Sequence, residues 1–375
     1  MSNAGQSEFR PGLEGVVAFQ TEIAEPDRDG GALRYRGVDI EDLVGTVSFG
    51  DVWALLVDGR FGDGLPPADD TAIPVRTNDA RADVQAALAM TAPICGFPPL
   101  LDIDEALARD QLARCSALGL SFVAQSARGD QLPVPQNRIA EATTAAEQFL
   151  VRWRGEPDPA HVQALDAYWV SAAEHGMNAS TFTARVIAST GADVAACLSG
   201  AVGAMSGPLH GGAPARVLPM IEETERTGDA RQVVESILDR RERLMGFGHR
   251  VYRVEDPRAR VLRNTCDQLR APRYEAAREL EQAALTALRE RRPDRQIETN
   301  VEFWAAVVLD FAQVPTAMMP AMFTCARLAG WSAHILEQKR TGRLVRPSAQ
   351  YVGPNPRAAQ DVTGWGSINQ LIASA

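Results

Sequence analysis

Residues 194–205 read VAACLSGAVGAM, and almost every side chain in this stretch is small and apolar. A helix without a polar face has to be packed on all sides, so the stretch predicts a large helical core. Helical spacing of apolar residues recurs elsewhere, for example over 105–127. A further helix is expected over about 137–153, after the prolines at 133 and 135. The one convincing β signal is N-terminal: residues 16–23 favour a strand, 29–31 a turn and 33–35 a return strand. The sequence therefore predicts an all-α fold with a small N-terminal β-hairpin.

Length and composition set further bounds. A chain of 375 residues exceeds what one hydrophobic core usually serves, so two domains are expected. The net charge of −10 argues against a general nucleic-acid binder. Five scattered cysteines without a C-x-x-C pair favour buried free thiols in a reducing compartment. We see no signal peptide and no apolar run of the ~18–20 residues that a membrane span requires, so we expect a cytoplasmic protein without a membrane partner.

Two glycine-framed histidines stand out in a chain with only five histidines. His210 lies in MSGPLHGG (205–212), and His249 lies in LMGFGHRVYRVEDPRAR (244–260). Glycine allows a backbone to approach a ligand closely, and Arg258 in the second motif can hold an anionic group. In the same motif, Asp256 and Pro257 predict the start of a helix, as an N-cap and a proline at the first helical position. The alternative is that the glycines are ordinary helix punctuation and the histidines cap helices. The occurrence of both motifs together favours a functional site.

Two charged residues stand in apolar surroundings. Glu302 opens the run VEFWAAVVL, where it is either a helix N-terminal charge stabilised by the dipole or a general base with a raised pKa. Arg327 lies in the middle of an apolar helix, and a buried arginine needs an anionic partner. That partner is either a structural carboxylate or the carboxylate of a substrate.

These motifs, in this order, resemble the citrate synthase family, and the resemblance covers nearly the whole chain. It suggests one of the shorter prokaryotic or actinobacterial-type members. The similar segments are GLEGVVAFQTEIAEPDRDGGALRYRGVDIEDLV, AEHGMNASTFTARVIAST, GPLHGG, GFGHRVYRVEDPRAR, TNVEFWAAVV, MFTCARLAGWSAHILEQ and RLVRPSAQYVG.

The resemblance implies a two-domain helical fold, with a large domain of residues 1–210 and 308–375, a small domain of residues 211–307, and an active site in the cleft. It implies acetyl-CoA and oxaloacetate as substrates, a homodimer with shared active sites, and no cofactor beyond the coenzyme A thioester itself. No metal is expected. The implied catalytic residues are His210, His249 and Glu302; the implied oxaloacetate-binding residues are His175, Arg258, Arg327 and Arg346; the implied coenzyme A-binding residues are Leu244, Gly246, Phe247, Gly248 and Arg253.

Glu302 departs from the family pattern, in which the catalytic acid is most often Asp. The extra methylene moves the carboxylate by about 1.5 Å on an unchanged backbone, and such a shift can cost ~10²-fold in rate. Two other functions stay open. One is 2-methylcitrate synthase, which uses propionyl-CoA and differs by one methylene. The other is a non-catalytic, coenzyme A-binding helical dimer.

Overall fold

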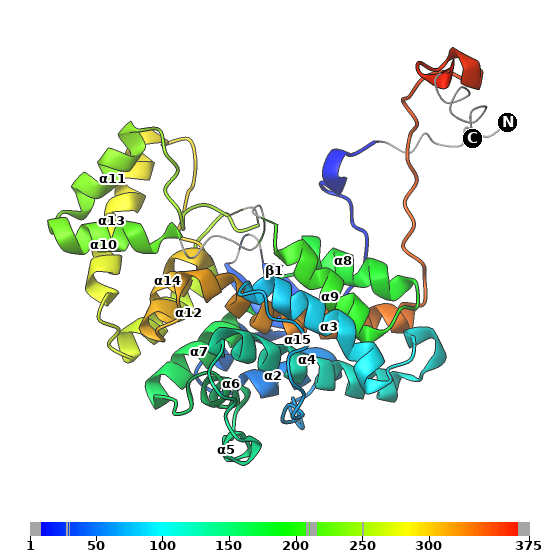
Figure 1. The fold of residues 1–375 in the computed structure, drawn as a ribbon. Coiled ribbons are helices and arrows are strands. Elements are labelled where there is room, and N and C mark those ends of the chain that lie inside the picture. Colours follow the sequence, from blue (N-terminus) through cyan, green and yellow to red (C-terminus); the bar gives the residue numbers. More distant parts are fainter. Residues whose placement is uncertain are drawn as a thin grey trace. The chain divides into compact units, whose positions relative to one another are not determined.

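The computed structural model describes residues 9–366, except 28, 30, 208–209, 211–215 and 250. The chain divides into two compact units, Thr21–Val345 and a terminal unit of Met1–Gln20 with Arg346–Ala375. Helices dominate the larger unit, so the predicted all-α fold is confirmed (Figure 1). The helices are α1 Ile40–Leu43, α2 Phe49–Asp58, α3 Ala80–Cys95, α4 Glu105–Arg128, α5 Gln136–Ala140, α6 Ala145–Arg154, α7 Pro159–Ala172, α8 Ala179–Ser189, α9 Val194–Met205, α10 Leu218–Thr227, α11 Ala230–Asp239, α12 Pro257–Gln268, α13 Tyr274–Arg291, α14 Val301–Phe311 and α15 Met319–Thr341.

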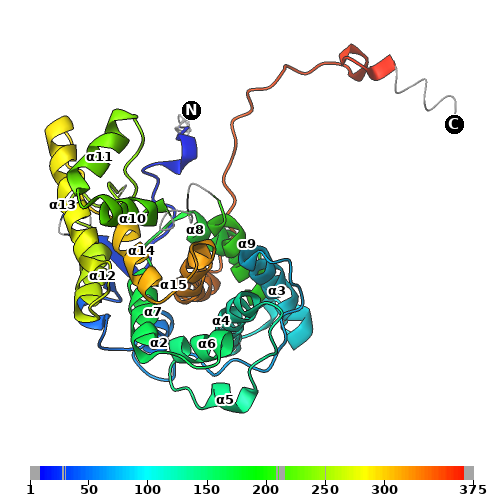
Figure 2. The ribbon, with the colours of Figure 1, turned by 60° about the vertical axis from the view of Figure 1, so that its left-hand side comes forward.

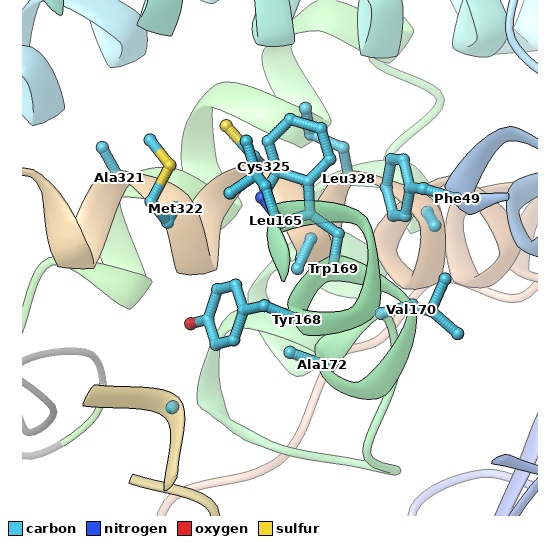
Figure 3. Close-up of a cluster of buried hydrophobic side chains, with 14 of the residues drawn as sticks. Phe49, Leu165, Tyr168, Trp169, Val170, Ala172, Ala321, Met322, Cys325 and Leu328 are labelled. Carbon is cyan, nitrogen blue, oxygen red and sulfur yellow. The ribbon is translucent and has the colours of Figure 1, made fainter. Parts of the chain in front are cut away.

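Helix α15 is the centre of the core. It packs against α2, α4, α7, α8 and α9, and Figure 2 shows these helices around it. Figure 3 shows the contact with α7, where Tyr168 and Trp169 meet Met322, Cys325 and Leu328. Because α7 ends beside α15, residues after α7 and residues on α15 come together in space.

Helix α9 is the VAACLSGAVGAM stretch, and it packs against both α8 and α3. Its small residues are required by close contact. A Cβ at Gly200 would overlap Cδ1 of Ile187 on α8, and a Cβ at Gly203 would lie 2.7 Å from Nε2 of Gln85 on α3. The prediction of a helix packed on several sides is therefore confirmed.

The N-terminal strand was predicted in the wrong place. The strands are β1 Ala24–Asp27, β2 Ala32–Tyr35 and β3 Val38–Asp39, in one antiparallel sheet of order β1-β2-β3. Asp27 pairs with Ala32, so the turn between them sets the register of the two strands. The last residue of β2 is Tyr35, which pairs with Ala24. Arg36 (φ 50°) and Gly37 (φ 84°) then reverse the chain, so β2 has no residues left to pair with 16–22.

The helix predicted over 137–153 is split into α5 and α6. Side-chain hydrogen bonds at the start of α6 explain the break. Oγ1 of Thr144 accepts the N–H of Glu147 at 3.2 Å, and a Glu147 carboxylate oxygen accepts the N–H of Thr143 at 2.7 Å. These bonds start a new helix at residue 145 and end the old one.

One stretch differs from the expectation that no apolar run is long enough to span a membrane. Among the described residues, Ala80–Asp102 is long and apolar enough to cross a membrane by length and composition, and 33% of its most apolar window is buried. Its helical part, α3, packs along α4 and α9, as a helix of a helical core does. In another part of the larger unit, α10, α11 and α13 pack against one another (Figure 1). The domain boundaries near residues 210 and 308 stay a prediction.

Candidate active site

The turn between α7 and α8 carries His175, and a buried tyrosine holds this turn. The hydroxyl of Tyr35 lies 3.1 Å from the carbonyl oxygens of Val170 and Ser171 and 3.2 Å from that of Glu174. The same hydroxyl accepts the N–H of Glu174 at 3.2 Å. The end of α7 is therefore fixed from the N-terminal hairpin, and His175 follows directly.

His175, His249 and Tyr252 form one aromatic cluster. The ring centroids of the two histidines lie 5.2 Å apart, and Nε2 of His175 lies 3.0 Å from the Tyr252 hydroxyl. Burial and the nearby guanidinium of Arg258 hold the pKa of His175 well below its usual range. His175 is therefore a neutral ring at physiological pH.

The hydrogen bonds of His249 determine its tautomer. Its Nδ1 accepts the backbone N–H groups of Val251 at 3.0 Å and Tyr252 at 3.2 Å. Burial and Arg258 lower the pKa of His249 to about 4, so the ring carries one proton, on Nε2. That Nε2 lies 3.2 Å from Nη2 of Arg258, which is also a donor. Two donors whose nitrogens lie this close can both donate to one oxygen atom of a ligand that is placed to one side of them.

Arg258 and Asp256 form a buried ion pair at the start of α12. Asp256 is fully buried and Arg258 is 3% exposed. Oδ1 of Asp256 accepts from Nε of Arg258 at 3.0 Å, and Oδ2 accepts from Nη2 at 2.8 Å. Asp256 caps α12 and Pro257 is its first residue, as the sequence predicts.

The second histidine motif is paired with the segment before Glu302. Residues 246–248 and 298–300 lie antiparallel, through an isolated β-bridge and hydrogen bonds such as Gly248 N–H to the Glu298 carbonyl at 2.8 Å. Gly246 has φ 85°, and a Cβ there would lie 2.8 Å from Cβ of Phe303. Only glycine fits this close approach. The pairing places the histidine motif beside the first turn of α14.

Glu302 lies in that first turn. Its N–H is accepted by Oδ1 of the capping residue Asn300 at 3.0 Å, and the N–H of Val301 is accepted by Asp256 at 3.1 Å. Burial raises the pKa of the Glu302 carboxyl, and Arg258 opposes part of that rise. A carboxylate with a raised pKa is a stronger base, which suits proton abstraction.

His210 contacts a small hydroxyl network. Its Nε2 lies 2.9 Å from Oγ of Ser180, which also accepts from Nε1 of Trp331 at 3.2 Å and lies 2.8 Å from Oδ1 of Asn178. Ser180 has one proton and two acceptors within reach. When that proton goes to Nε2, a neutral His210 carries its own proton on Nδ1. Burial and Arg327 lower the pKa of His210 to about 4, so the ring is neutral.

Arg327 is the buried arginine predicted from the apolar pattern, and it is 2% exposed. Its Nε donates to the carbonyl of Ala172 at 2.8 Å, and its guanidinium lies 4.8 Å from the ring centre of Phe323. Its Nη1 is buried without a hydrogen-bond partner among the described residues. Burial lowers the pKa of Arg327. A free donor on a buried guanidinium is suited to an anionic ligand.

For the remaining predicted residues, the structure gives the exposure of the side chain and the compact unit to which it belongs. Leu244 and Phe247 are buried, and Arg253 is exposed. Arg346 is exposed and belongs to the terminal unit. Within the first motif, Pro208, Leu209, Gly211 and Gly212 lie outside the described residues, as does Arg250 in the second.

Sequence reasoning missed several residues of the site. It took Asp256 only as a helix cap, and it did not single out Tyr35, Ser180 or Tyr252. Tyr252 and Asp256 lie inside the quoted second motif, so that motif held a signal for them. Tyr35 and Ser180 act through contacts between distant segments, which spacing does not reveal.

Two cavities lie apart from these residues. One of about 190 Å³ is lined by residues such as Asp51, Gln148 and Arg152, and one of about 250 Å³ by residues such as Gln163 and Asp166. Neither is lined by any of the predicted site residues. The chemistry of the candidate site therefore rests on contacts between side chains, and not on these cavities.

Comparison with known proteins places this arrangement in context. The family described as "Citrate synthase, C-terminal domain" matches residues 12–348. A Mycobacterium tuberculosis protein provisionally named citrate synthase 2 is 74% identical over 359 residues, covering 95% of this chain and 96% of that protein. A 2-methylcitrate synthase of Shewanella oneidensis is 32% identical, covering 92% and 95%. The solved ternary complex of Thermoplasma acidophilum citrate synthase with carboxymethyl coenzyme A and oxaloacetate is similar, with a TM-score of 0.79 and 26% identity, covering 94% of this chain and 98% of that one.

Proposed function

Because the chain belongs to the citrate synthase family of acyl-transferring enzymes, we propose that it condenses acetyl-CoA with oxaloacetate to give citrate and coenzyme A. The observation that carries the proposal is the contact set around Asp256. This carboxylate holds Arg258 and the first N–H of the helix that carries Glu302, so an anion-binding group and a candidate base share one support. The thioester is a substrate in this reaction, and no further cofactor is invoked.

The first step is enolisation of the thioester. Glu302 takes a proton from the methyl group of acetyl-CoA, and its raised pKa improves it as a base. His210 donates a hydrogen bond from Nδ1 to the thioester oxygen, where negative charge develops. This step requires the His210 tautomer with its proton on Nδ1, in which Nε2 accepts from the Ser180 hydroxyl at 2.9 Å in place of Oδ1 of Asn178.

Oxaloacetate is held by positive and neutral donors. Arg258, Arg327 and Arg346 bind its carboxylates, and His175 adds a neutral contact. The ketone oxygen accepts from both Nε2–H of His249 and Nη2 of Arg258, whose nitrogens lie 3.2 Å apart, from a position to one side of them. Such preorganised donors polarise the ketone for attack.

The enol carbon then attacks the ketone carbon of oxaloacetate. A carbon–carbon bond forms, the ketone π electrons move to oxygen, and that oxygen is protonated with His249 as the donor. Water next cleaves the thioester of the citryl product, so the acyl carbon gains a hydroxyl and coenzyme A leaves as the thiol. Residues 244–248 and Arg253 hold coenzyme A in this proposal.

The proposal includes a homodimer in which Arg346 reaches the partner's site. The exposed apolar side chains of α3, with Met90 41% and Ile94 50% exposed, suit burial against a second copy. Arg346 lies in a different compact unit from the other site residues. The proposal also treats residues 211–307 as a small domain that closes on the substrates and excludes water.

Steady-state assays with oxaloacetate and either acetyl-CoA or propionyl-CoA test the substrate. We expect the larger kcat/KM with acetyl-CoA. The second candidate, 2-methylcitrate synthase, is supported by the 32%-identical Shewanella relative. One methylene is worth only about 1–3 kcal/mol, so the ratio of the two kcat/KM values decides between them. Thioester binding without turnover of either compound would instead support a non-catalytic coenzyme A-binding dimer.

A further inference from the structure

The proposed reaction does not use Glu174, a fully buried carboxylate next to His175. Its side chain lies against α15, where a Cβ at Gly330 would overlap Oε2. Nε2 of His334 lies 3.3 Å from Oε1, but without hydrogen-bond geometry. Neither carboxylate oxygen has a hydrogen-bond partner among the described residues. A buried carboxylate in this state needs a source of positive charge.

His334 does not supply that charge. Nη1 of Arg185 lies 2.7 Å from Nδ1 of His334. A guanidinium nitrogen always donates, so Nδ1 must accept and carries no proton. The single ring proton is then on Nε2, on the side of Glu174. His334 is then a neutral ring, which leaves the charge of the carboxylate unbalanced.

The other buried arginines near the site already have partners. Arg185 pairs with Glu337 at 2.5 Å, and Arg258 pairs with Asp256 at 2.8 Å. Arg327 forms no ion pair within 4 Å in the described part of the chain, and its Nη1 is without a hydrogen bond. Among the described residues, Glu174 and Arg327 are thus opposite buried charges without a charged partner within 4 Å. Both lie where the end of α7 meets α15, because Nε of Arg327 donates to the Ala172 carbonyl and the Glu174 carboxylate lies against Gly330, about one turn further along α15.

We propose that Glu174 is the counter-charge of Arg327 in the empty site, a positioning residue that balances the guanidinium without occupying its free donor. Because the two groups are not in direct contact, Nη1 of Arg327 stays available for a ligand. The inference rests on the proposed function for the identity of that ligand, a carboxylate of oxaloacetate. It follows that Glu174 and the substrate act on the same positive charge, so Glu174 weakens oxaloacetate binding.

A double-mutant cycle tests the charge balance without any substrate. Glu174→Gln keeps the shape of the side chain and removes its charge, and Arg327→Met removes the opposite charge. In urea unfolding of the full chain, we expect Glu174→Gln to lower stability strongly in the wild-type background and much less in the Arg327→Met background. Equal losses in both backgrounds would overturn the proposal.

The matched control is Glu337→Gln, which removes a carboxylate of the same buried network whose partner is Arg185. Its effect should be the same with and without Arg327→Met. If Glu174→Gln alone does not fold, the double variant decides. If the double variant Glu174→Gln with Arg327→Met folds, the proposal is supported. If the double variant does not fold although Arg327→Met alone does, the proposal is contradicted.

Calorimetric titration with oxaloacetate tests the consequence for binding. Glu174→Gln should bind oxaloacetate roughly tenfold more tightly, the scale expected for removing one nearby charge at an effective dielectric of about 20. A residue that only supports packing would leave the affinity unchanged or weaken it, and either result overturns this consequence. If the wild-type protein does not bind oxaloacetate, the proposed function fails, while the unfolding cycle still decides the pairing of Glu174 with Arg327.

Discussion

Oδ2 of Asp256 accepts the backbone N–H of Val301 at 3.1 Å and Nη2 of Arg258 at 2.8 Å. One buried carboxylate therefore joins the first turn of α12 to the first turn of α14. Arg258 lies on the first helix and Glu302 on the second. In the proposed reaction these two residues serve different substrates. Because Asp256 joins their helices, it helps to fix the distance between them.

The first prediction concerns this link. Asp256→Asn should lower the free energy of unfolding by about 3–5 kcal/mol, because it leaves the buried Arg258 without its partner. Urea unfolding measures the loss. Asp58→Asn is the control: Asp58 pairs with Arg109 where both side chains are partly exposed (18% and 23%), so its loss should be smaller. Equal losses for the two variants would contradict the role given to Asp256.

The second prediction is that Glu302 is the base. Glu302→Gln should lower kcat by about 10²–10⁴-fold, the usual size of a lost general base, while oxaloacetate binding is preserved. Steady-state kinetics and calorimetry measure the two quantities. Glu302→Asp is an informative second variant, because it keeps the carboxylate but shortens the side chain by one methylene. Near-normal turnover in Glu302→Gln would remove the residue from the mechanism.

The third prediction assigns Arg258 to oxaloacetate. Arg258→Lys keeps the charge but loses the planar guanidinium, which binds Asp256 through Nε and Nη2 and has further N–H groups for the substrate. The KM for oxaloacetate should therefore rise by about one to two orders of magnitude. The KM for acetyl-CoA should change little. A rise confined to the thioester would mean that the two substrates have to be exchanged in this site.

The fourth prediction is a pH dependence of stability. Burial lowers the pKa of His210 and of His249 to about 4, whereas an unfolded histidine titrates near 6.5. Between these values the unfolded chain binds more protons, so the free energy of unfolding should fall as the pH falls from about 6.5 to about 4. The raised pKa of Glu302 opposes part of this loss. His249→Gln should flatten the dependence in urea unfolding at several pH values, and an unchanged slope would contradict the assignment.

The fifth prediction is that Arg346 completes the partner's site. Arg346→Ala and His249→Ala should each be nearly inactive. A heterodimer of the two would hold one site with both defects and one with neither. Random pairing of equal amounts should therefore restore up to about one quarter of wild-type activity. Confirmed heterodimers without recovered activity would mean that Arg346 does not act across the interface.

The sequence by itself determined the fold class and several local features, because each depends on residues that lie close together in the chain. The small apolar stretch over 194–205 could only be a helix packed on several sides, and Gly200 meets Ile187 as that pattern implies. The apolar surroundings of Arg327 predicted a buried arginine, and Arg327 is 2% exposed. Asp256 and Pro257 predicted a helix start, and α12 begins there.

Tertiary structure decided what depends on segments far apart in the chain. The first strand lies at 24–27 and not at 16–23. The turn and the length of β2 determine the pairing, whereas the β-propensity of residues 16–23 does not. Asp256 contacts Val301 only because residues 246–248 pair with 298–300. Nδ1 of His334 is an acceptor because of one contact with Arg185, which lies on another helix. These pairings and hydrogen-bonding roles depend on residues that are distant in the sequence, because burial and hydrogen bonding act through space. The spacing of residues in the sequence therefore does not predict them.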